Sequence, residues 1–149
     1  MNHKPILPPT YFLAAILSIL LLRFLLPITL LIPFPWHLLG IPILAAGLLL
    51  SIWADRLFHK ADTTVKPFQP STALVTAGPY RFSRHPMYLG FTAALAGLAI
   101  LLGALTPFFV VPVYGLLMDL IFIIPEEKAM EQTFGEEYQE YRARVRRWI

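Results

Sequence analysis

The sequence predicts an all-α integral membrane protein with four transmembrane helices and a C-terminal amphipathic helix on the cytoplasmic side. Hydrophobic residues make up 57% of the 149 residues and charged residues only 14%, whereas soluble domains carry about 25% charged residues. The apolar residues fall into four runs, each close to the ~20 residues that a helix needs to cross a bilayer. These run lengths argue against the alternative of a very apolar soluble protein.

The first span is expected over residues 10–32, which are mostly Leu, Ile, Phe and Ala. This run is too long for a cleaved signal peptide, and no small-x-small cleavage site follows it. Arg23 interrupts the run, and an arginine near the centre of a membrane helix costs about 2.5–3.5 kcal/mol on insertion scales. We therefore expect Arg23 to snorkel or to face other helices, and Pro27 to kink the helix.

The other spans are expected over residues 36–54, 86–105 and 108–124, within a single domain. Short turns separate the first span from the second and the third from the fourth. Between the second and third spans, the polar segment 55–85 contains prolines that preclude one long helix. Residues 126–149 are expected to form the amphipathic helix, because apolar residues recur there at helical spacing.

The placement of the basic residues predicts the orientation in the membrane. Of the 12 Lys and Arg residues, 11 lie in the N-terminal lead, the polar segment or the C-terminal tail, and the remaining one is Arg23. The positive-inside rule then places both termini and the polar segment in the cytoplasm. Next to a membrane span, the basic tail is interpreted as contacting lipid headgroups, so we expect membrane lipids rather than nucleic acid as its partner.

Several kinds of site are disfavoured by composition and spacing. The chain has no cysteine, which excludes disulfides, thiolate metal sites and a cysteine nucleophile. Its four histidines show no metal-ligand spacing, so no metal is expected. Glycine-rich phosphate-binding loops of the common kinds do not occur in the sequence.

The densest group of polar residues is the stretch GPYRFSRHPMYLG, residues 78–90. Its simplest explanation is a helix start at the membrane interface, with its arginines among lipid headgroups. The alternative is a binding site, because Tyr80, His85 and Tyr88 place three groups that stack or hydrogen-bond within one short segment. Gly90 lies one turn further, where a small residue lets a neighbouring helix or a ligand approach the backbone.

Acidic residues at the end of the fourth span form the second candidate group. Glu126 and Glu127 follow Pro125, a pattern that is also explained by a helix N-terminus. Asp119 lies inside the span, where an ionisable residue is a candidate functional residue. Pairing with Arg23 is disfavoured, since at 1.5 Å per residue Asp119 lies roughly 8 Å and Arg23 roughly 20 Å from the cytoplasmic end.

Together these motifs resemble a known family. The segments LVTAGPYRFSRHPMYLG, PEE and FGEEYQEYRARVRRWI, separated by a hydrophobic hairpin, are similar to the isoprenylcysteine carboxyl methyltransferase family and the related phospholipid methyltransferases. The resemblance covers roughly residues 63–149 and rests on the combination of motifs in order. It implies a membrane-embedded methyltransferase that uses S-adenosylmethionine, with the cofactor entering from the cytoplasm.

The resemblance also implies which residues form the cofactor site. These are Thr72, Ala73, Leu74, Val75, Tyr80, His85, Pro86, Met87, Tyr88, Gly90, Glu126 and Glu127. The residue types suit the cofactor, because a carboxylate and aromatic rings attract its sulfonium and ammonium groups, the rings through cation–π attraction.

The sequence departs from the prenylcysteine branch at one point. That branch has an arginine about one turn before the Glu pair, to hold a substrate carboxylate, but residues 121–124 here are Ile-Phe-Ile-Ile. We therefore expect a lipid or lipophilic small-molecule acceptor with an amine, hydroxyl or thiol, which Asp119 would orient or deprotonate as a catalytic residue. The alternatives are a membrane reductase resembling the sterol reductases and a non-enzymatic membrane scaffold of the same fold.

Overall fold

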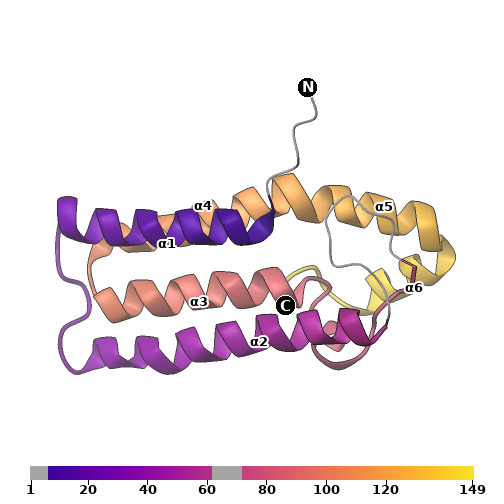
Figure 1. The fold of residues 1–149 in the computed structure, drawn as a ribbon, viewed down its shortest axis with the longest axis horizontal. Helices are drawn as coiled ribbons and strands as arrows, with labels where there is room; N and C mark the ends of the chain where they lie inside the picture. The colour runs from indigo at the N-terminus through magenta and orange to yellow at the C-terminus, as the bar shows by residue number, and fades with distance from the viewer. Residues whose placement is uncertain (1–6, 62–71) are drawn as a thin grey trace.

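The computed structural model describes residues 7–61 and 72–149, which form helices joined by short connections (Figure 1). The helices are α1 (Pro8–Leu25), α2 (Gly40–Lys60), α3 (Pro86–Leu102), α4 (Leu105–Met118), α5 (Ile124–Phe134) and α6 (Glu136–Arg144). Short 3-10 helices, η1 (Trp36–Leu39) and η2 (Gly78–Arg81), precede α2 and α3, and a π-helical turn, η3 (Asp119–Ile123), joins α4 to α5. Residues 1–6 and 62–71, in the expected N-terminal lead and polar segment, lie outside the described residues.

The helices have the length and composition of a membrane protein, as predicted. Three helical stretches are long and apolar enough to cross a bilayer: Pro8–Leu25, Trp36–Lys60 and Leu105–Phe134. Helix α3 is equally apolar but has 17 residues, at the lower limit for a spanning helix. Large apolar side chains face outward on several helices; Leu17 and Leu116, for example, are 58% and 59% exposed. Such a surface is suited to lipid rather than to water.

The first helix ends earlier than expected. Helix α1 stops at Leu25, and Leu26 leaves the helical region with φ −137° and ψ 57°. Pro27 thus ends the helix instead of kinking it, because a proline disfavours helical geometry in the residue before it. Beyond it the chain is extended, and Leu30 forms an isolated antiparallel bridge with Ala104 at the α3–α4 turn.

The C-terminal part also differs from the expected single helix over residues 126–149. Helices α4 and α5 run on through η3 without a break, so that the segment expected as the fourth span and the start of the segment expected as the C-terminal helix form one long helix. Pro125, which has no backbone N–H, is accommodated in this helix because the helical hydrogen-bonding pattern changes at the π turn directly before it. Gly135, at φ 51° and ψ −120°, then breaks the helix, and residues 145–149 follow α6 without helical structure.

Helices α2 and α3 pack in close contact through glycines. A Cβ on Gly47 would lie 2.5 Å from the Gly90 carbonyl oxygen, and a Cβ on Gly97 would meet the backbone of Leu44 and Gly40. Ser51 adds a hydrogen bond from its Oγ to the Met87 carbonyl, at 2.9 Å. Small residues that let helix backbones approach are typical of membrane helix interfaces. This contact sets the position of the start of α3, where the polar stretch lies.

The apolar core lies on the other side of α3. Figure 1 shows α1 and α4 together on one side of α3 and α2 on the opposite side. Ile19, Leu95, Met118 and Phe122 are fully buried between α1, α3 and the long fourth helix. A second, smaller cluster at the end of the bundle joins α6 to the segment before η2; its buried members are Tyr138, Tyr141 and Val145, with Leu74, Met130 and Phe134 packed against them.

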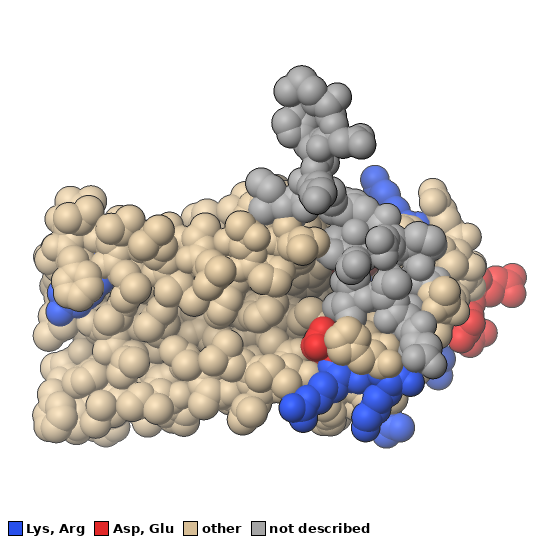
Figure 2. Space-filling view, viewed as in Figure 1, with Lys and Arg blue, Asp and Glu red and all other residues tan. Residues whose placement is uncertain are grey.

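Charged side chains gather at one end of the bundle. In the view of Figure 2, most Lys and Arg lie at the end that carries α5 and α6, and a small basic patch marks the opposite end. At that opposite end Arg23, in the last turn of α1, donates from Nε to the Leu102 carbonyl at 3.2 Å. Arg23 therefore faces another helix, as expected, and not Asp119.

Candidate functional site

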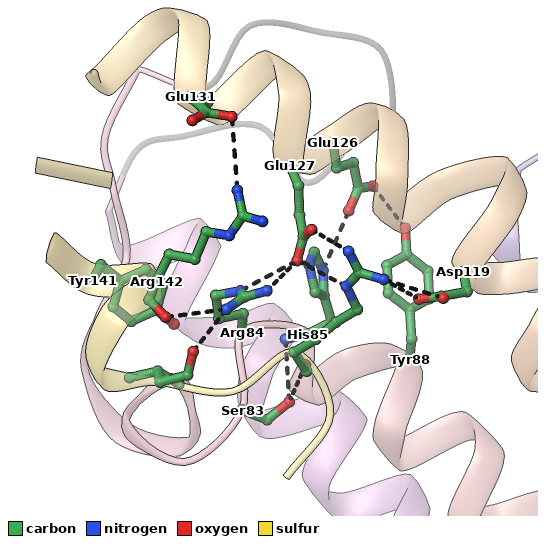
Figure 3. A network of polar contacts seen from close by, with 12 residues as sticks. Ser83, Arg84, His85, Tyr88, Asp119, Glu126, Glu127, Glu131, Tyr141 and Arg142 are labelled. Carbon is green, nitrogen blue, oxygen red and sulfur yellow. Dashed lines mark hydrogen bonds and ion pairs between the residues drawn. The ribbon is translucent and has the colours of Figure 1, made fainter. Parts of the chain in front are cut away.

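Three segments that are distant in the sequence meet at the charged end of the bundle (Figure 3). They are the start of α3, the η3–α5 part of the fourth helix and the C-terminal residues 145–149. His85 is the N-cap residue of α3, and Pro86 occupies the first turn, where its fixed φ suits a helix start. Ser83 Oγ accepts a hydrogen bond from the His85 backbone N–H at 3.1 Å and donates one to the Arg147 carbonyl at 3.1 Å.

Glu126 is the more exposed carboxylate of the Glu126–Glu127 pair. The Tyr88 hydroxyl donates to its Oε1 at 2.7 Å, and His85 Nδ1 lies 3.6 Å from its Oε2. Its side chain is 26% exposed. A carboxylate offers about four acceptor positions, so two partners leave Glu126 with capacity for a ligand while fixing its orientation.

Glu127 is saturated by partners from the protein. Arg84 binds its Oε1 through Nη2 at 2.6 Å and Nε at 3.2 Å. Arg147 binds both oxygens, with Nη2 to Oε2 at 2.7 Å and Nε to Oε1 at 3.2 Å. His85 Nε2 lies 3.3 Å from Oε1, and the Glu127 side chain is 7% exposed. Both oxygens of Glu127 are thus bound by protein groups, with most of the contacts on Oε1, as in a structural ion-pair network.

Asp119 occupies the first position of the π turn and faces the C-terminal segment. Arg147 Nη1 lies 3.3 Å from its Oδ2 and 3.5 Å from its Oδ1. The hydrogen bonds from Arg147 to Glu127, and the two nearby negative charges, raise the pKa of Arg147 above its ordinary value. Arg147 is therefore a permanent cation that joins two acidic residues of the long fourth helix.

Aromatic side chains surround the carboxylates. The rings of His85 and Tyr88 have centroids 6.0 Å apart, and Tyr88 stacks on Phe122 at 6.1 Å. Tyr80 is buried in η2, packs edge-on against Phe58 of α2 and accepts a hydrogen bond at its carbonyl from the Tyr141 hydroxyl at 2.7 Å. Burial raises the pKa of both Tyr80 and Tyr141, so both phenols stay neutral near pH 7.

The structure thus brings together His85, Tyr88, Asp119, Glu126 and Glu127 (Figure 3). Of the residues expected before η2, Leu74 packs against the small apolar cluster of Tyr138, Tyr141 and Val145. Ala73 and Val75 are half-buried, and Thr72 is exposed.

Three of the expected cofactor residues make packing contacts within the bundle. Gly90 faces Gly47 and Ser51 of α2, so a neighbouring helix covers it. Pro86 is fully buried, and the Met87 carbonyl accepts the Ser51 hydrogen bond. Cofactor contact stays a prediction for these three residues, as it does for the other expected cofactor residues.

The sequence interpretation missed the two arginines that hold the network. Contact with lipid headgroups was one of two alternatives for the stretch that contains Arg84 and the preferred interpretation of the basic tail that contains Arg147. It is wrong for both residues, since their side chains bind Glu127. For Arg84, the sequence feature that could have indicated a role in the site is its position directly before the His-Pro pair. No local pattern distinguishes Arg147 from its exposed neighbours Arg144 and Arg146.

Comparison with known proteins assigns this chain to a family. The family model described as phospholipid methyltransferase matches residues 35–137, more than half of the chain. The chain therefore belongs to the phospholipid methyltransferase family, which confirms the resemblance seen in its motifs. A comparison with curated protein sequences found no significant match.

The fold is also similar to a solved structure. One match is to the eukaryotic intramembrane Ras methyltransferase ICMT, isoprenylcysteine carboxyl methyltransferase, with a TM-score of 0.67 and 22% sequence identity. It covers 100% of this chain and 53% of that protein, so the chain spans about half the length of its structural relative. At this level of identity the likeness shows the fold, which is that of an integral membrane methyltransferase.

Proposed function

We propose that the protein transfers a methyl group from S-adenosylmethionine to a lipophilic acceptor that carries an amine, a hydroxyl or a thiol. The observation that supports this most is the position of Glu126. It is a partly exposed carboxylate, oriented by Tyr88 and His85 at the mouth of the bundle, with acceptor capacity left for a cationic or hydroxylated ligand.

The residues present suit this cofactor. S-adenosylmethionine supplies an activated methyl group, and its cationic and hydroxylated parts need acceptors and aromatic faces. Glu126 would accept from its ammonium or ribose groups, with Tyr88 and His85 holding that carboxylate in place. Residues 72–75 would line the approach. Glu127 would act indirectly, because its oxygens are already bound by Arg84, Arg147 and His85.

The acceptor is proposed from the charges near the membrane end of the site. Residues 121–124 are apolar, and the nearest cation, Arg147, is already bound by two carboxylates. No cation among these groups is left over for an acceptor carboxylate. An amine, hydroxyl or thiol on a lipid or lipophilic molecule fits better, entering between the helices. Asp119 would help to orient or deprotonate this acceptor, and would give up part of its contact with Arg147 to do so.

The charged end of the bundle would face the cytoplasm. The distribution of 11 of the 12 Lys and Arg residues supports this orientation. The site lies at the same end, so the cofactor would reach it from the cytoplasm without crossing the membrane.

Calorimetry with the purified protein tests the cofactor. We expect heat of binding with S-adenosylmethionine and none with a nicotinamide dinucleotide. Heat with the nicotinamide cofactor alone would indicate the reductase alternative. Folded protein that binds neither would indicate a non-enzymatic scaffold and contradict the proposal.

A transfer assay tests the acceptor. Methyl-labelled S-adenosylmethionine would be incubated with the protein and with extracted lipids, small amines, thiols or phenols. Label is expected in one of these classes and not in a prenylcysteine carboxylate. Transfer to the prenylcysteine carboxylate would contradict the proposed acceptor class and leave the cofactor assignment intact.

A further inference from the structure

The last residues of the chain are held against the candidate site by many specific contacts. Residues 145–149 have no helical structure, and chain ends of this kind normally fray unless they are tied down. Here the Arg146 carbonyl accepts from the Arg84 backbone N–H at 3.0 Å, and the Val145 carbonyl accepts from Arg84 Nη1 at 2.8 Å. Val145 is 8% exposed, and Trp148 packs against the core cluster.

Arg147 makes the contacts that reach furthest into the site. Its guanidinium joins Glu127 of α5 to Asp119 of η3. In a regular α-helix, residues eight apart differ by about 80° around the axis. The π turn that starts at Asp119 is wound more loosely and takes back part of this rotation. It thereby brings the two carboxylates toward one side, where a single guanidinium spans both.

A chain of contacts links this guanidinium to the carboxylate proposed for the ligand. Arg147 holds Glu127, Glu127 Oε1 lies 3.3 Å from His85 Nε2, and His85 Nδ1 lies 3.6 Å from Glu126 Oε2. If Arg147 were removed, Glu127 would lose one of its two guanidinium partners. Glu127 would then be held only through Oε1, by Arg84 and His85, so its carboxylate and His85 would be less firmly oriented and Glu126 would lose part of its support.

We propose that Arg147 is a positioning residue of the cofactor site, which docks residues 145–149 on Glu127 and Asp119 so that His85 and Glu126 stay oriented toward the ligand. The C-terminal segment is then part of the site, although it supplies no group that contacts the cofactor. This inference rests on the proposed function for its cofactor part, whereas the docking of the segment is independent of any ligand.

The first arm of the test measures binding of S-adenosylmethionine by calorimetry, well below the melting temperature of each variant. Arg147→Ala is expected to weaken binding about tenfold, the effect of losing one charge-assisted contact to an oriented carboxylate. Arg147→Lys should fall between Arg147→Ala and the wild type, because lysine keeps the charge but not the fork that spans two carboxylates. Arg146→Ala, which removes an exposed cation next to it, is the matched control and should bind as the wild type does.

The second arm reads docking without a ligand and uses the absence of native cysteine. Val145→Cys would place a thiol in the buried position, and Ala143→Cys would place one in an exposed position on α6. In the wild-type background, maleimide should label position 145 much more slowly than position 143. Adding Arg147→Ala should accelerate labelling at position 145 and leave position 143 unchanged.

Each outcome has a distinct meaning. Weaker binding together with faster labelling at position 145 supports the inference. If Arg147→Ala binds the cofactor as the wild type does, or labels no faster, Arg147 is not the positioning residue. Wild-type protein that binds no S-adenosylmethionine would overturn the proposed function and the cofactor part of the inference, and the labelling rates alone would decide the docking.

Discussion

The Tyr88 hydroxyl donates a 2.7 Å hydrogen bond to Glu126 and so connects the start of α3 to the start of α5. The two residues are 38 apart in sequence and meet at the mouth of the bundle. This contact orients the one carboxylate of the adjacent Glu pair that keeps room for a ligand. A substitution that removes only the Tyr88 hydroxyl therefore separates its role in orienting Glu126 from the packing of its ring.

Tyr88→Phe removes this hydroxyl and keeps the ring that stacks on Phe122. A hydrogen bond to a charged group contributes about 1.5–3 kcal/mol, so the affinity for S-adenosylmethionine should fall roughly tenfold or more. Calorimetry measures the change. The matched control is Tyr114→Phe, because the buried Tyr114 hydroxyl has no hydrogen-bond partner among the described residues. Equal effects of the two substitutions would contradict the orienting role of Tyr88.

Glu126 and Glu127 should respond differently to the same change. Glu126→Gln is expected to weaken cofactor binding by more than tenfold and to leave the melting temperature in detergent nearly unchanged. Glu127→Gln should lower stability, since removing one partner of a buried ion pair costs about 3–5 kcal/mol, and it should weaken cofactor binding less than Glu126→Gln does, because Glu127 acts through His85. Binding isotherms and thermal unfolding curves of the two variants give this comparison. A reversed pattern would mean that Glu127 is the ligand carboxylate.

The glycine contact between α2 and α3 predicts a stability effect far from the polar site. Gly47→Ala would place a methyl group against the α3 backbone, and overpacking of this kind costs about 1–3 kcal/mol. Gly115→Ala is the control, because its Cβ would meet nothing within 4 Å and alanine favours a helix by about 1 kcal/mol. The melting temperature should fall for Gly47→Ala and stay equal or rise for Gly115→Ala.

The proposed orientation can be tested with single cysteines, since the chain has none. Gln132→Cys lies on α5 at the charged end, and Phe34→Cys lies at the opposite end, where Phe34 is 77% exposed. A membrane-impermeant maleimide should label position 34 in intact cells and position 132 only after the cells are opened. The opposite pattern would place the site outside the cytoplasm.

The sequence by itself determined the membrane fold, because apolar run lengths and the placement of Lys and Arg are set by the bilayer and not by side-chain packing. It also identified the group around His85, Tyr88 and Glu126, since residues that share local motifs stay together when helices start or end at one membrane surface. The end of α1 at Leu25 could also have been predicted from the sequence, because the restriction that Pro27 imposes on the backbone of Leu26 is local.

Only the tertiary structure decided how the two carboxylates differ. Glu126 and Glu127 are adjacent in sequence, and which one is saturated depends on Arg84 and Arg147, from two other segments. It likewise decided that Gly90 faces α2 rather than open space. The physical reason is that ion pairs and close helix contacts form between segments distant in the chain, so no local pattern distinguishes an inward arginine or a packed glycine from an exposed one.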